Sequence, residues 1–120
     1  MYYHLDIDNQ IRKIMSKVKE SDLGKKSCDG DLVDITDGEL YKTLLASEDG
    51  ILFKNKSAFS LTLNTDGISP YKHSNLTIWP VYLVINELPL ETRFSIDNTI
   101  LAGKFLILKL LKIFKYLYLI

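Results

Sequence analysis

The sequence predicts a protein of the α+β class, because patterns typical of helices and of strands follow one another along the chain. Residues 7–18 carry apolar side chains at helical spacing, whereas Leu61 and Leu63 alternate with polar residues at the two-residue period of a half-buried strand. Residues 76–85 are apolar on both faces of a predicted strand, which is typical of burial on both sides. A chain of 120 residues, 47% hydrophobic and 25% charged, is long enough for one domain with a core.

Two helices are expected in the N-terminal part of the chain. Either Asp6 or Asp8 can cap the first helix. Its apolar face consists of Ile7, Ile11, Ile14, Met15 and Val18. A polar linker from Glu20 to Asp31 follows, so residues 1–33 are predicted to be a helix and a linker. The second helix is predicted to begin at Asp34 or Asp37. Its apolar stripe, which we expect in the core, consists of Leu40, Tyr41, Leu44 and Leu45.

Residues 34–103 are predicted to be a partial α+β unit, and three strands, the last of which extends a few residues beyond this unit, are predicted to form an antiparallel meander. The first ends at Asp66, the second covers Leu76 to Ile85, and the third runs from Asn98 to Ile107 with Gly103 as a point where it can break. Pro80 cannot donate a backbone hydrogen bond, so we expect a bulge or an unpaired edge at this position of the second strand. The residues between the second and third strands are predicted to form a connecting loop, since they contain a proline and several charges.

The tail, residues 104–120, differs from the rest of the chain in charge. It contains four lysines and no acid, whereas the whole chain has no net charge, so the remainder is acidic. In a helix these lysines would lie within about 140° of arc, opposite a wide apolar face. A membrane span needs about 20 mostly apolar residues, and the tail is too short and too charged for one. We therefore expect a C-terminal amphipathic helix. Its lysines are Lys104, Lys109, Lys112 and Lys115.

Several classes of function are disfavoured by what the chain lacks. Cys28 is the only cysteine, which excludes an intramolecular disulfide and a zinc site of the Cys-x-x-Cys kind. The N-terminus has neither the basic start nor the apolar run of a secretory signal, so we expect an intracellular protein, nuclear or cytoplasmic. No Ser/His/Asp arrangement and no glycine-rich phosphate loop can be recognised, so we expect no small-molecule substrate.

Asp66 is the candidate functional residue, because it stands at the end of the first predicted strand. An Asp-Gly pair is most simply a turn, since the carboxylate accepts backbone hydrogen bonds and Gly67 tolerates a positive φ. A carboxylate at a strand end can also hold a divalent metal ion. Lys72 and His73, in the following loop, are candidates for contacts with nucleic acid, and His73 is also a candidate metal ligand beside Asp66, although solvated loop residues are the simpler interpretation.

Several short motifs distinguish this chain from an arbitrary α+β domain. They are Asp34-Ile-Thr-Asp-Gly38 followed by Tyr41, Asn64-Thr-Asp-Gly67, Pro70-Tyr-Lys-His-Ser74, Ile78-Trp-Pro-Val-Tyr82, Asn86-Glu-Leu-Pro89, Arg93-Phe94 and Asn98-Thr-Ile-Leu-Ala-Gly103. Together they resemble the start of the catalytic domain of CACTA-type transposases, over about residues 31 to 103. The resemblance implies a partial RNase H-like domain, in which carboxylates on a sheet bind two divalent ions for phosphoryl transfer.

The resemblance matches Asp66 to the first of these carboxylates and supplies no second one. Two metal ions about 3.5 to 4 Å apart need several acids, and one carboxylate cannot position the pair. Glu87, Glu91 and Asp97 are expected at the other end of the meander, and the family's remaining acids would follow residue 120. We therefore expect no enzymatic activity, no bound cofactor beyond Mg²⁺ held weakly by Asp66, and weak DNA binding at most.

The tail departs from the transposase pattern. Relatives continue after the position of Gly103 with glycine, proline and polar residues, whereas this chain continues with lysine and large apolar residues. We expect a truncated, degenerate sequence in which a frameshift or read-through produced the tail. The alternative is a small interaction protein in which residues 104–120 dock on a membrane surface or a partner protein, because basic amphipathic helices bind anionic surfaces. The tail could also cover the sheet of this same domain.

Overall fold

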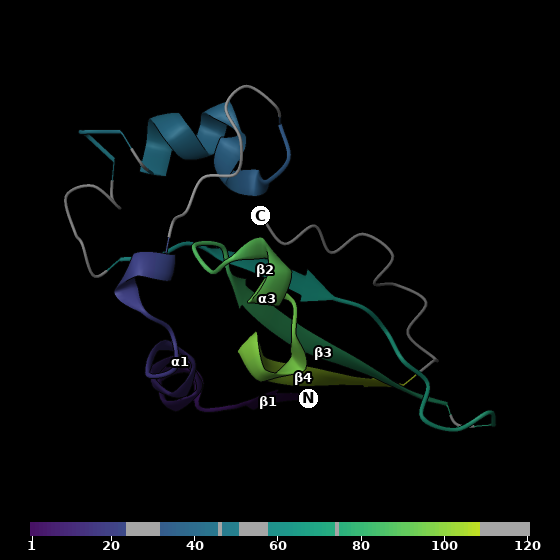
Figure 1. Ribbon diagram of the computed structural model, residues 1–120. Coiled ribbons are helices and arrows are strands. Elements are labelled where there is room, and N and C mark those ends of the chain that lie inside the picture. The colour runs from purple at the N-terminus through teal and green to yellow at the C-terminus, as the bar shows by residue number, and fades with distance from the viewer. Residues whose placement is uncertain (24–31, 46, 51–57, 74, 109–120) are drawn as a thin grey trace.

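The computed structural model describes residues 1–23, 32–45, 47–50, 58–73 and 75–108. It is a mixed α+β structure built on one antiparallel sheet with the strand order β1-β4-β3-β2, as Figure 1 shows. The four strands are β1 (Tyr2–His4), β2 (Leu61–Thr65), β3 (Leu76–Ile85) and β4 (Thr99–Leu108). The predicted α+β class is therefore confirmed. Cys28 and residues 109–120 lie outside the described residues.

The sheet has one strand more than predicted. Strands β2, β3 and β4 pair in sequence order, but β1 pairs with the outer side of β4, with Tyr2 opposite Phe105 and His4 opposite Gly103. The Tyr2 and Phe105 rings pack with their centroids 4.5 Å apart. Aromatic residues favour strands and cross-strand ring pairs stabilise them. The prediction of a three-stranded sheet was wrong because three residues are too few to show a strand period.

Helix α1 (Ile7–Met15) is the first predicted helix. Asp6, rather than Asp8, is its N-cap, and its carboxylate accepts a hydrogen bond from the backbone N–H of Asn9 at 3.0 Å. The predicted apolar face is confirmed, because Ile14 is buried in the core and the other four residues of that face pack against it. Ile14 belongs to a cluster of buried residues with Ile85, Leu88 and Ile100, and the sheet also buries Val81, Val84 and Ala102.

Gln10 of α1 protects the sheet edge that β1 leaves uncovered. The pairing of β1 with β4 ends at His4, and the N–H of Leu5 donates one further bond to the carbonyl of Ala102 at 3.0 Å. The Gln10 side chain then donates to the carbonyl of Leu101 and accepts from its N–H, both at 2.9 Å. A carboxamide carries both a donor and an acceptor, so Gln10 replaces one residue of a strand.

The second predicted helix is short and irregular. A 3-10 turn, η2 (Ile35–Asp37), begins after its N-cap Asp34, and a helical segment follows whose last five residues, η3 (Tyr41–Leu45), have π-helical geometry. The expected core stripe was wrong, because Leu40 and Leu44 are 71% and 59% exposed. The Asp37 carboxylate accepts from the N–H groups of Val33 and Asp34, at 3.1 and 2.9 Å, and so completes a capping box with Asp34. The chain then becomes extended at Gly38, which separates η2 from the helical segment that follows.

Two further predictions need correction. The connection between β3 and β4 is not a plain loop, since it contains the short helix α3 (Leu90–Arg93) and the 3-10 turn η4 (Ile96–Asn98). Strand β4 runs without a break through Gly103 to Leu108. The predicted amphipathic helix therefore does not begin at Lys104, and the remaining tail lysines lie outside the described residues. None of the helices in the described ranges has the length and apolar character needed to cross a bilayer.

Candidate functional site

Asp66 lies immediately after β2, at a point where the pairing with β3 is interrupted. Thr65 is paired with Val81, and pairing resumes at Ile68, which exchanges two backbone hydrogen bonds of 2.8 Å with Ile78. The register is the same before and after the gap, so Asp66 lies opposite Pro80. Proline has no N–H to donate, which explains why the ladder breaks at this pair.

The irregularity expected at Pro80 is present on both sides of this position in β3. Towards β2, the Thr65 hydroxyl donates to the Pro80 carbonyl at 2.8 Å. Towards β4, the register shifts between Val81 and Tyr82, so that Ala102 is an extra residue of the bulge on β4. Pro80 is nevertheless in an interior strand, because β3 lies between β4 and β2.

Gly67 lies between the end of β2 and the bridge at Ile68, in the same register with β3, and is not part of a turn. It lies opposite Trp79, and a Cβ atom at this position would approach the indole ring to 2.7 Å. Glycine is needed here for the close approach of the ring. The prediction of a turn at Asp66-Gly67 was wrong, because the chain turns only after Ile68, around Lys72 and His73.

The structure places the three predicted site residues towards one end of the sheet without hydrogen bonds among them. Asp66, Lys72 and His73 are exposed, and Lys72 and His73 lie in the turn at the same end of β2 as Asp66. Within the described ranges, none of the three makes a hydrogen bond or an ion pair with another, and no group of three potential metal ligands is found. Lys104 is paired with Pro80, so it is one strand farther across the sheet from Asp66.

The acids that follow β3 lie at the other end of the sheet. Glu87 accepts hydrogen bonds from the backbone N–H and the hydroxyl of Ser60, which precedes β2, whereas Asp66 follows β2. Six residues of extended chain separate Ser60 from Asp66, which corresponds to about 20 Å. Glu91 in α3 and Asp97 in η4 belong to the same connection as Glu87. These acids are therefore too far from Asp66 to bind, together with it, two metal ions about 3.5 to 4 Å apart.

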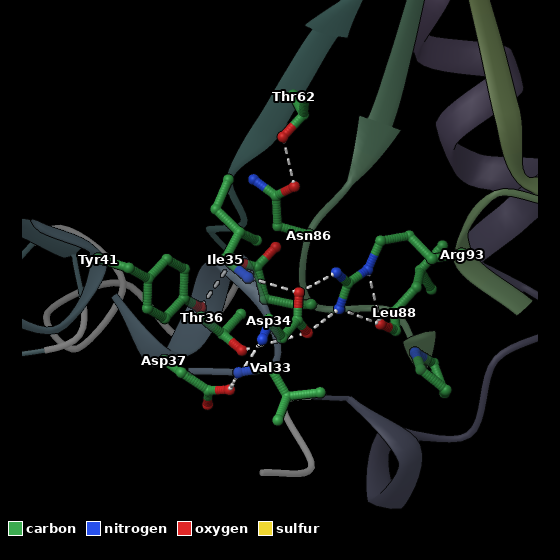
Figure 2. Close-up of polar contacts among 12 residues, drawn as sticks. Val33, Asp34, Ile35, Thr36, Asp37, Tyr41, Thr62, Asn86, Leu88 and Arg93 are labelled. Carbon is green, nitrogen blue, oxygen red and sulfur yellow. Dashed lines mark hydrogen bonds and ion pairs between the residues drawn. The ribbon is translucent and has the colours of Figure 1, made fainter. Parts of the chain in front are cut away.

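A buried ion pair links the segment before η2 to α3. The Arg93 guanidinium is 4% exposed and forms two hydrogen bonds with the Asp34 carboxylate, at 2.5 and 2.6 Å (Figure 2). It also donates to the carbonyl of Leu88 through Nε and Nη2, at 3.1 and 2.9 Å. Hydrogen bonding from Arg93 lowers the pKa of the Asp34 carboxyl, although partial burial opposes the shift.

A second set of hydrogen bonds attaches the same segment to the start of β2. The Tyr41 hydroxyl donates to the Glu87 carboxylate at 2.9 Å, and burial followed by this hydrogen bond raises the pKa of Tyr41. Asn86 accepts from the hydroxyl of Thr62 at 2.7 Å and donates to the Ser60 hydroxyl at 3.0 Å. The sequence motifs around Asp34, Tyr41, Asn86 and Arg93 therefore meet in space. The sequence alone did not predict that these residues contact one another. The one indication was that their motifs all belong to the set that resembles the transposases.

A pocket of about 400 Å³ lies between these two linked regions. Its walls are mostly apolar and include Leu32, Ile35, Leu90 and Phe94. Its polar lining residues are bonded in pairs, Asp34 with Arg93 and Thr62 with Asn86. No buried side-chain nitrogen or oxygen of the described residues lacks a hydrogen-bond partner. The hydrogen bonds between the polar groups of this pocket therefore contribute to the stability of the fold.

Comparisons with known proteins found no match to any protein-family model, to any curated protein or to any solved structure. The class defined by the structure is an α+β protein with a four-stranded antiparallel sheet. The resemblance to transposases is supported by the short sequence motifs alone.

Proposed function

We propose that this protein is a transposon-derived fragment resembling the start of a transposase catalytic domain, with an RNase H-like core and without nuclease activity. The observation that carries the proposal is the position of Asp66. It directly follows the first of three strands that pair in sequence order, and Glu87 is bound to Ser60 at the far end of that strand. Such a sheet can present one carboxylate to a metal ion where a cleaving enzyme needs several.

Asp66 is suited to a weakly held, mostly hydrated divalent ion. Mg²⁺ keeps several of its waters and is usually bound by one or two carboxylates together with substrate phosphates. Lys72 and His73 lie at the same end of the sheet and are exposed, so they can contact a phosphate of DNA. Because the body of the chain is acidic outside the tail, we expect such DNA binding to be weak and strongly dependent on salt.

A cleavage assay tests the absence of activity. We expect no nicking of supercoiled plasmid with Mg²⁺ or Mn²⁺, for the wild type and for Asp66→Asn alike. A commercial nuclease added to the same reactions verifies that the plasmid can be cut. Nicking by the wild type that Asp66→Asn removes would overturn the proposal of an inactive fragment.

A metal titration tests the remaining site. Paramagnetic Mn²⁺ should broaden the amide NMR signals of residues 65–68 first, and Asp66→Asn should remove this selective broadening. Asp97→Asn is the matched control, because Asp97 is an exposed acid in η4 and belongs to the other end of the sheet. Broadening that is unaffected by Asp66→Asn would show that Asp66 holds no metal ion.

The alternative function, docking of residues 104–120 on a membrane surface or a partner protein, is restricted by the structure. Residues 104–108 belong to β4, so a docking helix would have to lie within residues 109–120. Replacing Lys109, Lys112 and Lys115 by glutamate tests this alternative in a co-sedimentation assay with anionic vesicles. If the wild type sediments with the vesicles and this variant does not, the docking function is favoured over a transposon-derived fragment that has no partner.

A further inference from the structure

The two edges of the sheet differ in how they are protected. On the β1 side, the edge strand has three residues and Gln10 occupies the next position along β4. On the other side, β2 is the terminal strand among the described residues, and Leu61–Thr65 contains no charge and no proline. Natural proteins usually protect edges with charged residues, prolines, bulges or short strands. The β2 edge has no such protection within its five residues apart from its modest length.

The pairing of β2 with β3 shows which backbone groups of β2 face β3 and which face the other way. Hydrogen-bonded and non-hydrogen-bonded pairs alternate along an antiparallel ladder. The carbonyl of Ser60 accepts from the N–H of Asn86 at 3.0 Å, and Ile68 forms a hydrogen-bonded pair with Ile78 in the same register. Even-numbered residues of β2 therefore direct their N–H and C=O groups towards β3. Leu61, Leu63 and Thr65 direct theirs outwards.

The same three residues share one face of the sheet. Leu61 lies opposite Ile85 and Leu63 opposite Leu83, and this is the face on which Ile85 packs against Ile14 of α1. Leu61 and Leu63 are 40% and 52% exposed. Among the residues that the structure describes, no strand covers the apolar layer at the β2 edge.

We propose that β2 pairs with β2 of a second copy of this chain, antiparallel and with a two-fold axis at Leu63. Leu63 then lies opposite Leu63 of the second copy, and Leu61 lies opposite Thr65. Each of these pairs uses outward-directed backbone groups, and the leucines of both copies extend one apolar layer. A two-fold interface of this kind is closed, so it produces a dimer and not a fibre. The proposal goes beyond the transposon-derived origin and does not depend on it.

Charge favours a second copy as the occupant of this edge. Residues 57–65 contain no charged side chain, so the two strands bring no like charges together. In this register the two Asp66 carboxylates lie at opposite ends of the shared ribbon, about 20 Å apart along the strands. Repulsion between them is therefore small at physiological ionic strength.

Sedimentation measures the oligomeric state of the full chain. We expect twice the mass of one chain at micromolar concentrations, and a monomer for Leu63→Lys, which places two ammonium groups at the two-fold axis. Ile96→Lys is the matched control, because Ile96 is 89% exposed in η4 and should leave the dimer unchanged. A wild type that stays monomeric, or an equal loss of dimer in both variants, would overturn the proposal.

A cysteine cross-link tests the register independently of how the lysine variants fold. In a Cys28→Ser background, Leu63→Cys should form a disulfide between copies on mild oxidation, because hydrogen-bonded antiparallel pairs have Cα atoms about 5.5 Å apart. Leu61→Cys should not, since two Leu61 residues would be about 13 Å apart. Cross-linking through Leu61→Cys and not through Leu63→Cys would exclude this register, and cross-linking by neither would exclude the interface.

Discussion

Asp34 and Arg93, 59 positions apart in sequence, form a buried ion pair with two hydrogen bonds of 2.5 and 2.6 Å. The guanidinium also donates to the carbonyl of Leu88, which follows β3. One side chain of α3 therefore connects the segment before η2 with the residues that leave the sheet. Arginine suits this position because its planar group presents several donors in a fixed geometry. Together with the Tyr41–Glu87 hydrogen bond, the ion pair holds residues 32–45 against the sheet.

Removing Arg93 should destabilise the protein strongly. Arg93→Met leaves the Asp34 carboxylate partly buried without its partner, and loss of one member of a buried pair costs about 3 to 5 kcal/mol. The free energy of unfolding from urea titrations measures this effect. Arg12→Met is the control, since Arg12 lies on the exposed side of α1 and should change stability by less than about 0.5 kcal/mol. A similar small change for Arg93→Met would contradict the role of the ion pair.

The same ion pair should make the free energy of unfolding depend on pH. The folded state lowers the pKa of Asp34 below its ordinary value of 3.8. The pair therefore contributes stability above that value, and this contribution is lost as the pH falls through the lower pKa of the folded state. We expect the wild type to unfold at a higher urea concentration than Asp34→Asn at pH 7. The difference between the two urea midpoints should be smaller near pH 3. An advantage that is constant with pH would argue against ionised Asp34 as the source.

Gly67→Ala should disturb the packing of Trp79. The added Cβ would lie 2.7 Å from the indole ring, so either the ring or the strand must move. Overpacking of this kind costs about 1 to 3 kcal/mol. Trp79 is the only tryptophan, so its fluorescence maximum reports the movement directly. Ser69→Ala, two positions along, should change neither quantity, and combining Gly67→Ala with Trp79→Leu should recover much of the loss in stability.

Pro80→Val should close the gap in the ladder opposite Asp66. The new N–H can donate to the Asp66 carbonyl, which adds about 1 kcal/mol, while removing proline frees the unfolded chain by about 0.4 to 1 kcal/mol. The two effects nearly cancel, so we expect little change in stability. Hydrogen exchange is the informative measurement, because the new amide should be protected as strongly as that of Ile78. Rapid exchange at position 80 would show that something other than the missing donor interrupts the ladder.

Local patterns were sufficient for α1, β3 and most of β4. The face of α1 is visible because its apolar side chains recur at helical spacing, and the Asp6 cap lies directly before it. The end of β2 before Asp66 follows from the alternation of Leu61 and Leu63 with polar residues. The resemblance to transposases, and the metal site that it implies at Asp66, stay predictions.

Other features depend on contacts between distant segments, which no periodicity reveals. Strand β1 exists because β4 offers it an edge, and Gly67 is needed because Trp79 lies across from it and not because the chain turns. The pairing of Asp34 with Arg93 joins residues that a local reading assigned to a helix cap and a loop. The amino-acid order by itself determined the helix and strand periods, since these need only neighbouring residues. The folded chain decided the partners, because a hydrogen bond or ion pair between remote residues forms only where the backbone brings them together.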